Sequence, residues 1–557
     1  MTGTASHIAI AAPTGATRLV ESLEQLRAEL VFGLPGVHNL PIWKALSDSG
    51  IRLVSVRHEQ TAVYAADGYA RSTGRLGIAL VTTGPGAANT LGATGEAMAS
   101  SSPVLVIATD MASSLRREGI YGGTLHETRD QTAMFRPVTK AARLVETVEE
   151  IPGITLEFGR IAGTAPSGPV YLGVPTDLLS KELSAVGAAI PAPEARTPLH
   201  QDDLTRATSL LAGAQRPLIW AGGGALRADA GALVGELALR LAAPVITTHM
   251  SRGLLGPGHS CAVPGPVHAE QVGPLWDEAD VVLAIGTDFD GTMTQNWLMP
   301  APPMLIAVNL DEAEASKNYR SDLTLVGDAQ TVLEQLVPLV APRDGLQQLK
   351  ARLAAIAAQV SAWVQADDPQ AASFLEIMHR ALPADAIVVT DMCIPGYWLG
   401  GYWRAPAPRK LAYPLGWGTL GFGFPASLGA GLAGAGPTVC VCGDGGFMYA
   451  CGELATVVQE RIPLTIVLVD DGGYGMLRFD QRLAGEEPFG VDLVTPDFVA
   501  LANSFGVPAG TVEGFGPEFE HALRDSIAGA EPRMIVVRAT LKPPPTTSPR
   551  WYRKRSA

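Results

Sequence analysis

The residues best suited to chemistry are two short acidic, glycine-rich segments late in the chain. The first is Gly443-Asp444-Gly445-Gly446, and the second is Asp470-Asp471-Gly472-Gly473-Tyr474, with Asp471 27 residues after Asp444. Carboxylate and carbonyl oxygens are the ligands that Mg²⁺ prefers, and bound Mg²⁺ often keeps phosphate oxygens as well. Glycines let the backbone approach phosphates closely. The two segments therefore predict a Mg²⁺ and diphosphate site, with Asp444, Asp471 and the Gly473 carbonyl on the metal.

The elements around these segments place both on one side of a sheet. An apolar run at 438–442 leads into the first segment, a helix-like stretch spans 453–460, and a second apolar run at 464–469 leads into the second segment. This order of strand, loop, helix and strand is typical of a parallel sheet. Ligands of open α/β sheets bind outside the carboxyl ends of the strands. We expect Asp444 and Asp471 to emerge there together.

Strand-like and helix-like stretches alternate along the whole chain, which predicts an α/β fold with parallel sheets throughout. A chain of 557 residues is too long for one core. We predict three α/β domains at 1–183, 200–345 and 370–540, and a C-terminal tail at 541–557. An Ala/Pro-rich linker at 185–198 separates the first two domains, and a helical connection at 347–365 leads to the third. The tail is proline-rich and then basic, so it is either a disordered end or a flap over a site.

Composition excludes several classes of function. The net charge of −14 argues against a nucleic-acid partner, which requires a basic face. The sequence has no apolar run of about 18 residues and no signal-peptide pattern, so we expect neither membrane association nor secretion. The five cysteines lack a zinc-like pattern and are expected to be reduced. These features indicate a cytoplasmic enzyme.

The spacing of the acidic segments resembles the thiamine-diphosphate signature, in which Gly-Asp-Gly is followed, after a helix and a strand, by Asn-Asn. Further segments are similar to the acetolactate synthase-like family and occur in the same order. These segments are Arg57-His58-Glu59-Gln60 with residues 65–71, residues 83–89, Gly168-Pro169-Val170 and residues 421–426. The chain departs from the family at Asp470-Asp471, which replaces Asn-Asn.

The resemblance implies pyrimidine-binding, central and diphosphate-binding domains, with thiamine diphosphate and Mg²⁺ as cofactors. It assigns Glu59 to activation of the cofactor and Leu420 to the support beneath it, and the Gly418 carbonyl is expected to accept from the aminopyrimidine. From the residues alone, Glu59 could equally be a first-turn helix glutamate and Leu420 a core leucine. The remaining cofactor-binding residues that the resemblance implies are Asp391, Met392, Cys393, Gly443, Asp444, Gly445, Gly446, Asp471, Gly473, Tyr474 and Gly475. Asp391 could also be a simple turn residue.

The substrate side is indicated by Gly123-Thr124-Leu125-His126-Glu127, where acetolactate synthases carry Phe-Gln-Glu. This segment looks more like 5-guanidino-2-oxopentanoate decarboxylase, and His126 could bind a carboxylate or relay a proton. It could also be a surface or core histidine. Val37 and Leu477 stand where pyruvate decarboxylases carry acidic residues, which predicts an apolar pocket and argues against simple pyruvate decarboxylation.

Flavin is the remaining cofactor question, because acetolactate synthases bind FAD through the central domain. Residues 286–290 resemble part of that region, but Val263-Pro264-Gly265-Pro266 replaces the family's Gly-Met-His-Gly loop. We therefore expect no FAD.

The resemblance implies an enzyme that decarboxylates a 2-oxo acid and transfers the product to a carbonyl acceptor, as a homodimer or homotetramer. The alternative outcome is non-oxidative decarboxylation that releases an aldehyde. From a different class, a non-catalytic metabolite-binding protein on the same scaffold would not need Glu59, and a purely structural subunit has only composition in its favour.

Overall fold

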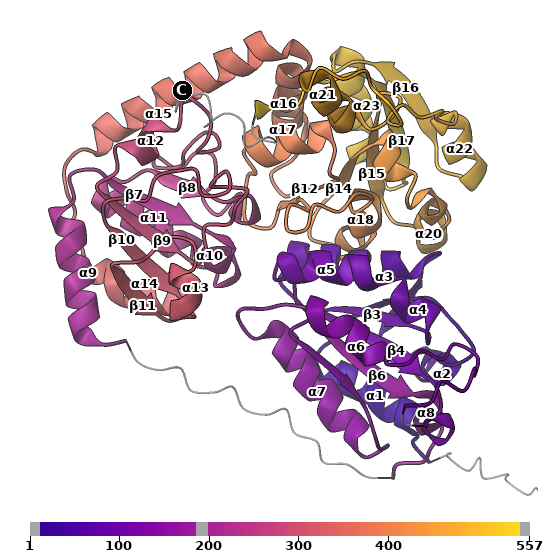
Figure 1. Ribbon diagram of the computed structural model, residues 1–557. Coiled ribbons are helices and arrows are strands. Elements are labelled where there is room, and N and C mark those ends of the chain that lie inside the picture. Colours follow the sequence, from indigo (N-terminus) through magenta and orange to yellow (C-terminus); the bar gives the residue numbers. More distant parts are fainter. Residues whose placement is uncertain (1–11, 118, 185–198, 546–557) are drawn as a thin grey trace, which may run out of the picture. The chain divides into compact units, whose positions relative to one another are not determined.

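A computed structural model describes residues 12–117, 119–184 and 199–545 of the chain (Figure 1). These residues form three sheets whose paired strands all run parallel, which confirms the predicted α/β class. The expected linker at 185–198 and the basic end of the tail lie outside the described residues.

The first sheet has the strand order β2-β1-β3-β4-β6-β5. Its strands are β1 (Leu30–Gly33), β2 (Arg52–Ser55), β3 (Gly77–Val81), β4 (Val104–Asp110), β5 (Ala141–Leu144) and β6 (Val170–Pro175). The helices between them are α1 (Gly15–Gln25), α2 (Leu40–Ser47), α3 (Glu59–Thr73), α4 (Pro85–Ala88), α5 (Leu91–Ala99), α6 (Gln131–Phe135), α7 (Glu150–Gly163) and α8 (Thr176–Leu179). Strands β3, β4 and β6 are buried along their whole length, as expected for parallel strands covered on both faces.

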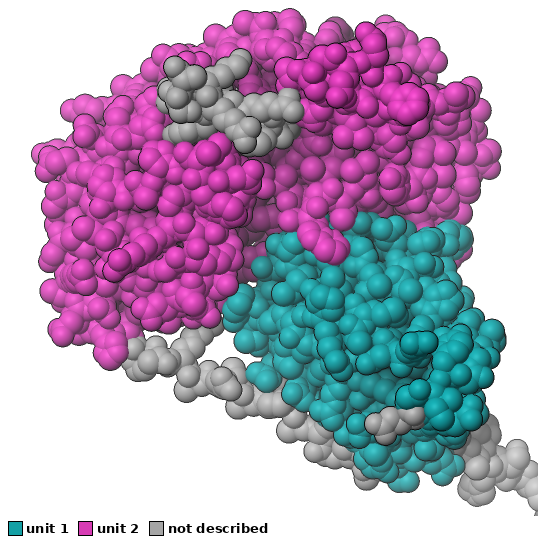
Figure 2. Space-filling view, in the orientation of Figure 1, with its two compact units in different colours: residues 1–70, 75–193 teal, residues 71–74, 194–557 magenta. Residues whose placement is uncertain are grey.

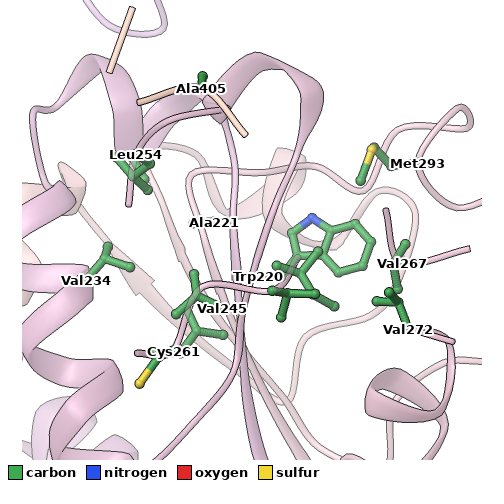
Figure 3. Packing of buried hydrophobic residues seen from close by; sticks show 14 of the residues in the cluster. Trp220, Ala221, Val234, Val245, Leu254, Cys261, Val267, Val272, Met293 and Ala405 are labelled. Atoms are coloured by element: carbon green, nitrogen blue, oxygen red, sulfur yellow. The ribbon is translucent and has the colours of Figure 1, made fainter. Parts of the chain in front are cut away.

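The second sheet has the order β11-β10-β9-β7-β8. Its strands are β7 (Pro217–Ala221), β8 (Val245–Thr247), β9 (Val281–Ile285), β10 (Leu305–Asn309) and β11 (Leu323–Val326). Its helices are α9 (Gln201–Gly213), α10 (Gly223–Arg227), α11 (Gly231–Leu241), α12 (Pro274–Asp277), α13 (Glu312–Ser316) and α14 (Ala329–Leu336). Trp220 of β7 is fully buried in the core of this sheet, with Val267 and Val272 beside it (Figure 3).

The long helix α15 (Leu346–Asp367) leads to the third sheet, with the order β13-β12-β14-β15-β17-β16. Its strands are β12 (Ile387–Thr390), β13 (Leu411–Ala412), β14 (Thr438–Gly443), β15 (Leu464–Asp470), β16 (Ala509–Glu513) and β17 (Arg533–Arg538). Its helices are α16 (Pro369–Ala381), α17 (Ile394–Tyr402), α18 (Gly423–Leu432), α19 (Asp444–Phe447), α20 (Leu454–Glu460), α21 (Gly475–Leu483), α22 (Phe498–Phe505) and α23 (Pro517–Ala528).

The chain divides into two compact units (Figure 2). Unit 1 comprises residues 1–70 and 75–193 and contains the first sheet, and unit 2 comprises residues 71–74 and 194–557 and contains the other two. The domain limits predicted at 183, 200, 345, 370 and 540 remain predictions. No helix within the described ranges is long and apolar enough to cross a bilayer.

Candidate functional site

The two acidic segments of unit 2 lie side by side at the carboxyl edge of the third sheet. Strands β14 and β15 are paired in parallel, with Gly443 opposite Val469, so each acidic segment begins where its strand ends (Figure 1). Asp444 is only 1% exposed, and its two carboxylate oxygens accept hydrogen bonds from the backbone amides of Gly445 at 2.7 Å and Gly473 at 2.8 Å. The Asp444 side chain therefore joins one segment to the other.

The loop that carries Asp471 has a backbone that only glycine adopts easily. Gly473 has a φ of +149°, and a Cβ there would overlap the carbonyl oxygen of Val491. The next amide, that of Tyr474, donates to this Val491 oxygen at 2.9 Å. Arg478 completes the loop by donating from Nη1 to the Asp471 carbonyl oxygen at 3.2 Å. These hydrogen bonds fix the backbone around Asp471 and Gly473, the two residues of this segment that the sequence predicted as metal ligands.

The electrostatics of this edge favour a bound cation. Burial, and then the negative charge of Asp471, raise the pKa of Asp444 well above its usual range. Burial also raises the pKa of Asp471, while Arg478 opposes that rise. A buried and a half-buried carboxylate side by side are costly to ionise without a positive charge nearby, and a divalent cation would remove that cost. The residues therefore fit Mg²⁺ chemically.

Protein side chains alone would not complete such a metal site. In the described part of the chain, no group of three or more histidine, cysteine, aspartate or glutamate side chains is placed to hold a metal ion. Two carboxylates and backbone carbonyls leave coordination positions that Mg²⁺ normally fills with water and phosphate oxygens. The donor set is that of a cation that shares its ligands with a bound phosphate compound.

A pocket of about 680 Å³ opens beside the acidic pair in unit 2. Many of the predicted cofactor residues line it, namely Met392, Cys393, Leu420, Gly443, Asp444, Gly445, Gly446, Asp471, Gly473, Tyr474 and Gly475. Its other walls are mostly apolar and include Ile394, Met476, Leu477 and Leu541. The structure thus brings together eleven residues that the sequence placed at one site, and Leu420 is a half-buried wall residue of the pocket. Leu477 supplies the apolar wall predicted for it.

Two predicted cofactor residues, Asp391 and Gly418, are not part of the pocket lining. Asp391 is 1% exposed, and its carboxylate accepts from the amides of Met392 at 2.7 Å, Gly421 at 3.0 Å and Gly423 at 3.3 Å. Burial raises its pKa to about 6, although these amides oppose the rise. The Asp391 side chain therefore holds the turn that follows Leu420 against the end of β12.

The residues of unit 1 that the sequence predicted for catalysis or substrate binding lie at the carboxyl edge of the first sheet. Glu59 is the first residue of α3 and accepts a hydrogen bond from Nδ2 of Asn89 at 3.0 Å. Its other carboxylate oxygen lies beside Gly86, where an added Cβ would be 3.5 Å away. His126 lies in the loop after β4 and is half-buried, and Val37 is 65% exposed. Glu59 and His126 both belong to unit 1, whereas the pocket belongs to unit 2.

Sequence reasoning missed His38, which contacts His126. His38 directly follows Val37, a predicted substrate-side position, in the loop after the buried strand β1, and this placement is visible in the sequence. The presence of a single histidine in a loop does not by itself indicate a function. Its partner, His126, is 88 residues further along the chain, so only the folded structure shows the pair.

The segment expected to exclude FAD lies within the packed second sheet. Val263 and Val267 are both buried and belong to the same apolar cluster as Trp220. A Cβ on Gly265 would contact Val272 at 3.4 Å and Val360 at 3.6 Å, so this segment packs closely against neighbouring side chains. The absence of FAD stays a prediction.

Comparison with known proteins agrees with the resemblance seen in the sequence. Three models of thiamine pyrophosphate enzyme domains match: the N-terminal binding domain at residues 13–134, the central domain at 204–336 and the C-terminal binding domain at 393–537. "Probable 2-ketoarginine decarboxylase AruI" of Pseudomonas aeruginosa is 38% identical over 508 residues, which cover 88% of each chain.

Acetolactate synthases are also similar over most of their length. A probable acetolactate synthase large subunit of Methanocaldococcus jannaschii is 32% identical over 94% of this chain and 91% of its own. Acetolactate synthase isozyme 3 large subunit of Escherichia coli is 32% identical over 88% of both chains.

Proposed function

The chain belongs to the thiamine pyrophosphate enzyme family, and on that premise we propose that it decarboxylates a 2-oxo acid with thiamine diphosphate and Mg²⁺. The observation that carries the proposal is the unit 2 pocket, in which the acidic pair of buried Asp444 and half-buried Asp471 adjoins an apolar chamber. When bound, thiamine diphosphate supplies a nucleophilic carbon for the 2-oxo group and takes up the electrons that CO₂ leaves behind.

Each residue then has a defined part in binding. Asp444, Asp471 and the Gly473 carbonyl would hold Mg²⁺, and the glycine-rich turn of residues 443–446 would offer amides to the diphosphate. The charge of Asp471, where the family carries asparagine, should strengthen the hold on Mg²⁺ while disfavouring the diphosphate somewhat. Leu420 projects into the pocket and would support the cofactor from one side, because it lines the chamber and lies outside the packed core.

Glu59 is the proposed activating acid. Its carboxylate stands at the start of α3 with one oxygen bound by Asn89, which leaves the other beside the small residue Gly86. This arrangement suits an acid that donates to or accepts from a heteroaromatic ring, and the Asn89 amide fixes its orientation.

The second half of the reaction has two candidate outcomes. Transfer of the decarboxylated fragment to a carbonyl acceptor is favoured by the apolar pocket wall around Leu477, which offers no proton donor at that point. Release of an aldehyde after protonation is favoured by the similarity to a 2-ketoarginine decarboxylase over 88% of the chain. Both outcomes begin with the same loss of CO₂.

We further propose that the protein assembles as a homodimer or homotetramer, with Glu59 and Asp444 of different subunits serving one site. Large apolar side chains are exposed on each unit: Leu125 at 66% in unit 1, and Trp417 and Tyr449 at 56% each in unit 2. Exposed apolar groups of this size commonly mark interaction surfaces.

The experiment that tests this function compares Glu59→Gln with Glu312→Gln, a matched change at an exposed glutamate. Wild type loaded with thiamine diphosphate and Mg²⁺ is given pyruvate, 5-guanidino-2-oxopentanoate and other 2-oxo acids, with and without an aldehyde acceptor. We expect CO₂ release from at least one acid, lowered at least about 100-fold by Glu59→Gln, with cofactor affinity changed only slightly. No CO₂ from any 2-oxo acid, or a fully active Glu59→Gln, would contradict the proposal.

A further inference from the structure

Two histidines from distant parts of unit 1 face each other at the carboxyl edge of its sheet. His38 lies in the loop after β1, and His126 lies in the loop after β4. Their ring centroids are 5.3 Å apart, with the ring planes at 77°, so the edge of one ring points at the face of the other. Both side chains are half-buried, which leaves them partly open to a ligand.

A hydrogen-bond chain determines which nitrogen of His38 carries hydrogen. Nδ1 of His38 lies 2.8 Å from the hydroxyl of Thr83, and that hydroxyl donates its single proton to Oγ1 of Thr109 at 2.9 Å. Because the Thr83 oxygen has no second proton to give, it accepts from Nδ1–H of His38. Nε2 is therefore the position at which His38 gains and loses a proton.

His126 has an unfavourable backbone conformation and a buried ring nitrogen without a hydrogen-bond partner among the described residues. Its φ is +64°, in the left-handed region that is uncommon for residues with a Cβ, and its Nδ1 is buried without a hydrogen-bond partner in the described residues. The next side chain, Glu127, fixes the loop by accepting from the amides of Gly122 at 3.0 Å and Thr124 at 2.8 Å. Strained backbone and an unpartnered buried nitrogen often mark positions that serve a ligand.

The loop of residues 83–89 attaches this pair to Glu59. Thr83 holds His38, a Cβ on Gly84 would lie 3.0 Å from Cβ of His126, and Asn89 holds Glu59. A group that binds at the Glu59 carboxylate therefore lies along the same sheet edge as the two histidines. This shared loop connects the pair to the proposed chemistry.

We propose that His38 and His126 act as a proton-sharing pair that decides whether the decarboxylated fragment is protonated or passed to a carbonyl acceptor. This inference rests on the proposed function and deepens it. Nε2 of protonated His38 would donate its proton to the carbon that has lost CO₂, and the electron pair that CO₂ left behind would form the new C–H bond. The imidazolium becomes neutral imidazole and regains a proton from water. When Nε2 of His38 carries no proton, the same electron pair would form a C–C bond to the acceptor carbonyl, whose π electrons would move to its oxygen and take a proton from water.

The charges around His38 make this proton sensitive to pH. Burial lowers the pKa of His38, the neighbouring His126 lowers it further, and Asp110 opposes this. Asp110 is itself paired with Arg116 at 3.4 Å and lies near Asp130. The loop that carries His126 holds the further charged side chains Arg117, Glu127 and Arg129. Two adjacent imidazoles do not both hold an extra proton readily, so the neighbouring ring makes protonation of His38 less favourable.

The first test measures proton uptake without turnover. The cofactor-free full-length protein is labelled with ¹³C at histidine Cε1 and titrated by NMR, in wild type, His126→Asn and the control His521→Asn, whose side chain is 79% exposed. We expect the pKa of His38 to lie below its usual value of about 6.5 and to rise in His126→Asn but not in the control. An unchanged His38 titration in His126→Asn would overturn the pairing.

The second test measures the partition of products. Loaded enzyme receives a 2-oxo acid and a saturating aldehyde acceptor, and the ratio of released aldehyde to carboligation product is followed from pH 5.5 to 8.5. We expect this ratio to fall up to about tenfold per pH unit above the pKa of His38. In His38→Asn, which keeps an amide donor for Thr83 but cannot be protonated, aldehyde formation should fall about 100-fold while acceptor-dependent CO₂ release stays within about threefold.

Thr83 supplies the positioning control. Thr83→Val removes the acceptor for Nδ1 and should flatten the pH dependence of the product ratio, and Thr83→Ser should restore it. A ratio that follows pH equally in wild type and His38→Asn refutes the role of the pair even though CO₂ is released. Failure of wild type to release CO₂ refutes the proposed function instead, and the NMR titration still decides whether the pair exists.

Discussion

The proposed Mg²⁺ site is most directly tested by adding one carbon at Gly475. Gly475 is the first residue of α21, directly after the acidic loop. An alanine Cβ there would overlap Oδ2 of Asp471, with Cγ of that residue 3.2 Å away and Cδ1 of Ile394 also at 3.2 Å. Carbon atoms in contact prefer about 3.5–4.0 Å, so the Asp471 carboxylate must turn away from its present position.

We expect Gly475→Ala to weaken metal binding without lowering the stability of the fold. Only the end of one side chain has to move, and alanine is favoured over glycine in a helix by up to about 1 kcal/mol, so the free energy of unfolding should stay the same or rise slightly. Mg²⁺ requires ligands within about 0.2 Å of their preferred distances. Displacing the Asp471 oxygen should therefore weaken Mg²⁺-dependent cofactor binding by about 10- to 100-fold.

The assay measures both quantities on Gly475→Ala and on Gly452→Ala, an exposed helical glycine where an added Cβ meets nothing within 4 Å. Urea unfolding without Mg²⁺ gives the stability, and titration calorimetry of thiamine diphosphate over a Mg²⁺ series gives the apparent metal affinity. If Gly475→Ala binds Mg²⁺ and cofactor like Gly452→Ala, the Asp471 carboxylate seen here is not a metal ligand. A large loss of stability would instead show that Gly475 is needed for packing.

Three further outcomes are expected. Leu420→Ala should lower CO₂ release strongly but lower the free energy of unfolding by only about 1 kcal/mol, because this side chain lines a pocket. A decrease of about 2–5 kcal/mol in the free energy of unfolding would identify Leu420 as a core residue. His268 is 2% exposed, and burial and then Arg252 lower its pKa to about 4. On acidification, His268 of the unfolded state therefore takes up a proton near pH 6.5, before His268 of the folded state does, and the protein loses stability between about pH 6.5 and 4. His268→Gln should reduce this loss by about 1.4 kcal/mol per pH unit in that range. Urea unfolding over a pH series measures the difference. Glu59→Gln and Asp444→Ala chains are each expected to be inactive alone. After subunit exchange the mixture should regain about a quarter of full activity, because half of the dimers are mixed and half of the sites in a mixed dimer are intact. Mixed dimers without activity would show that Glu59 and Asp444 of one chain serve the same site.

The sequence alone determined where the acidic pair stands. Apolar runs that are buried on both faces become parallel strands, and the residues that follow two neighbouring strands must meet at one edge of the sheet. Asp444 and Asp471 therefore came together from local pattern and topology, and so did the glycine-rich turn of residues 443–446 and the wall residue Leu420. The alternation of strand-like and helix-like stretches carried the fold class, and the family resemblance carried the cofactor, because its motifs are contiguous segments.

Only the tertiary structure decided what Asp391 and His38 do. The sequence left open whether Asp391 is a cofactor-binding residue or a turn residue, and the structure shows its carboxylate bound by amides from a turn about 30 residues away. His38 finds His126 and Thr83 across three strands, and its protonation site follows from where the Thr83 hydroxyl points. Such roles depend on which groups reach hydrogen-bond distance after packing. Residue types along the chain do not encode those distances, because they arise from the close packing of elements that are far apart in sequence.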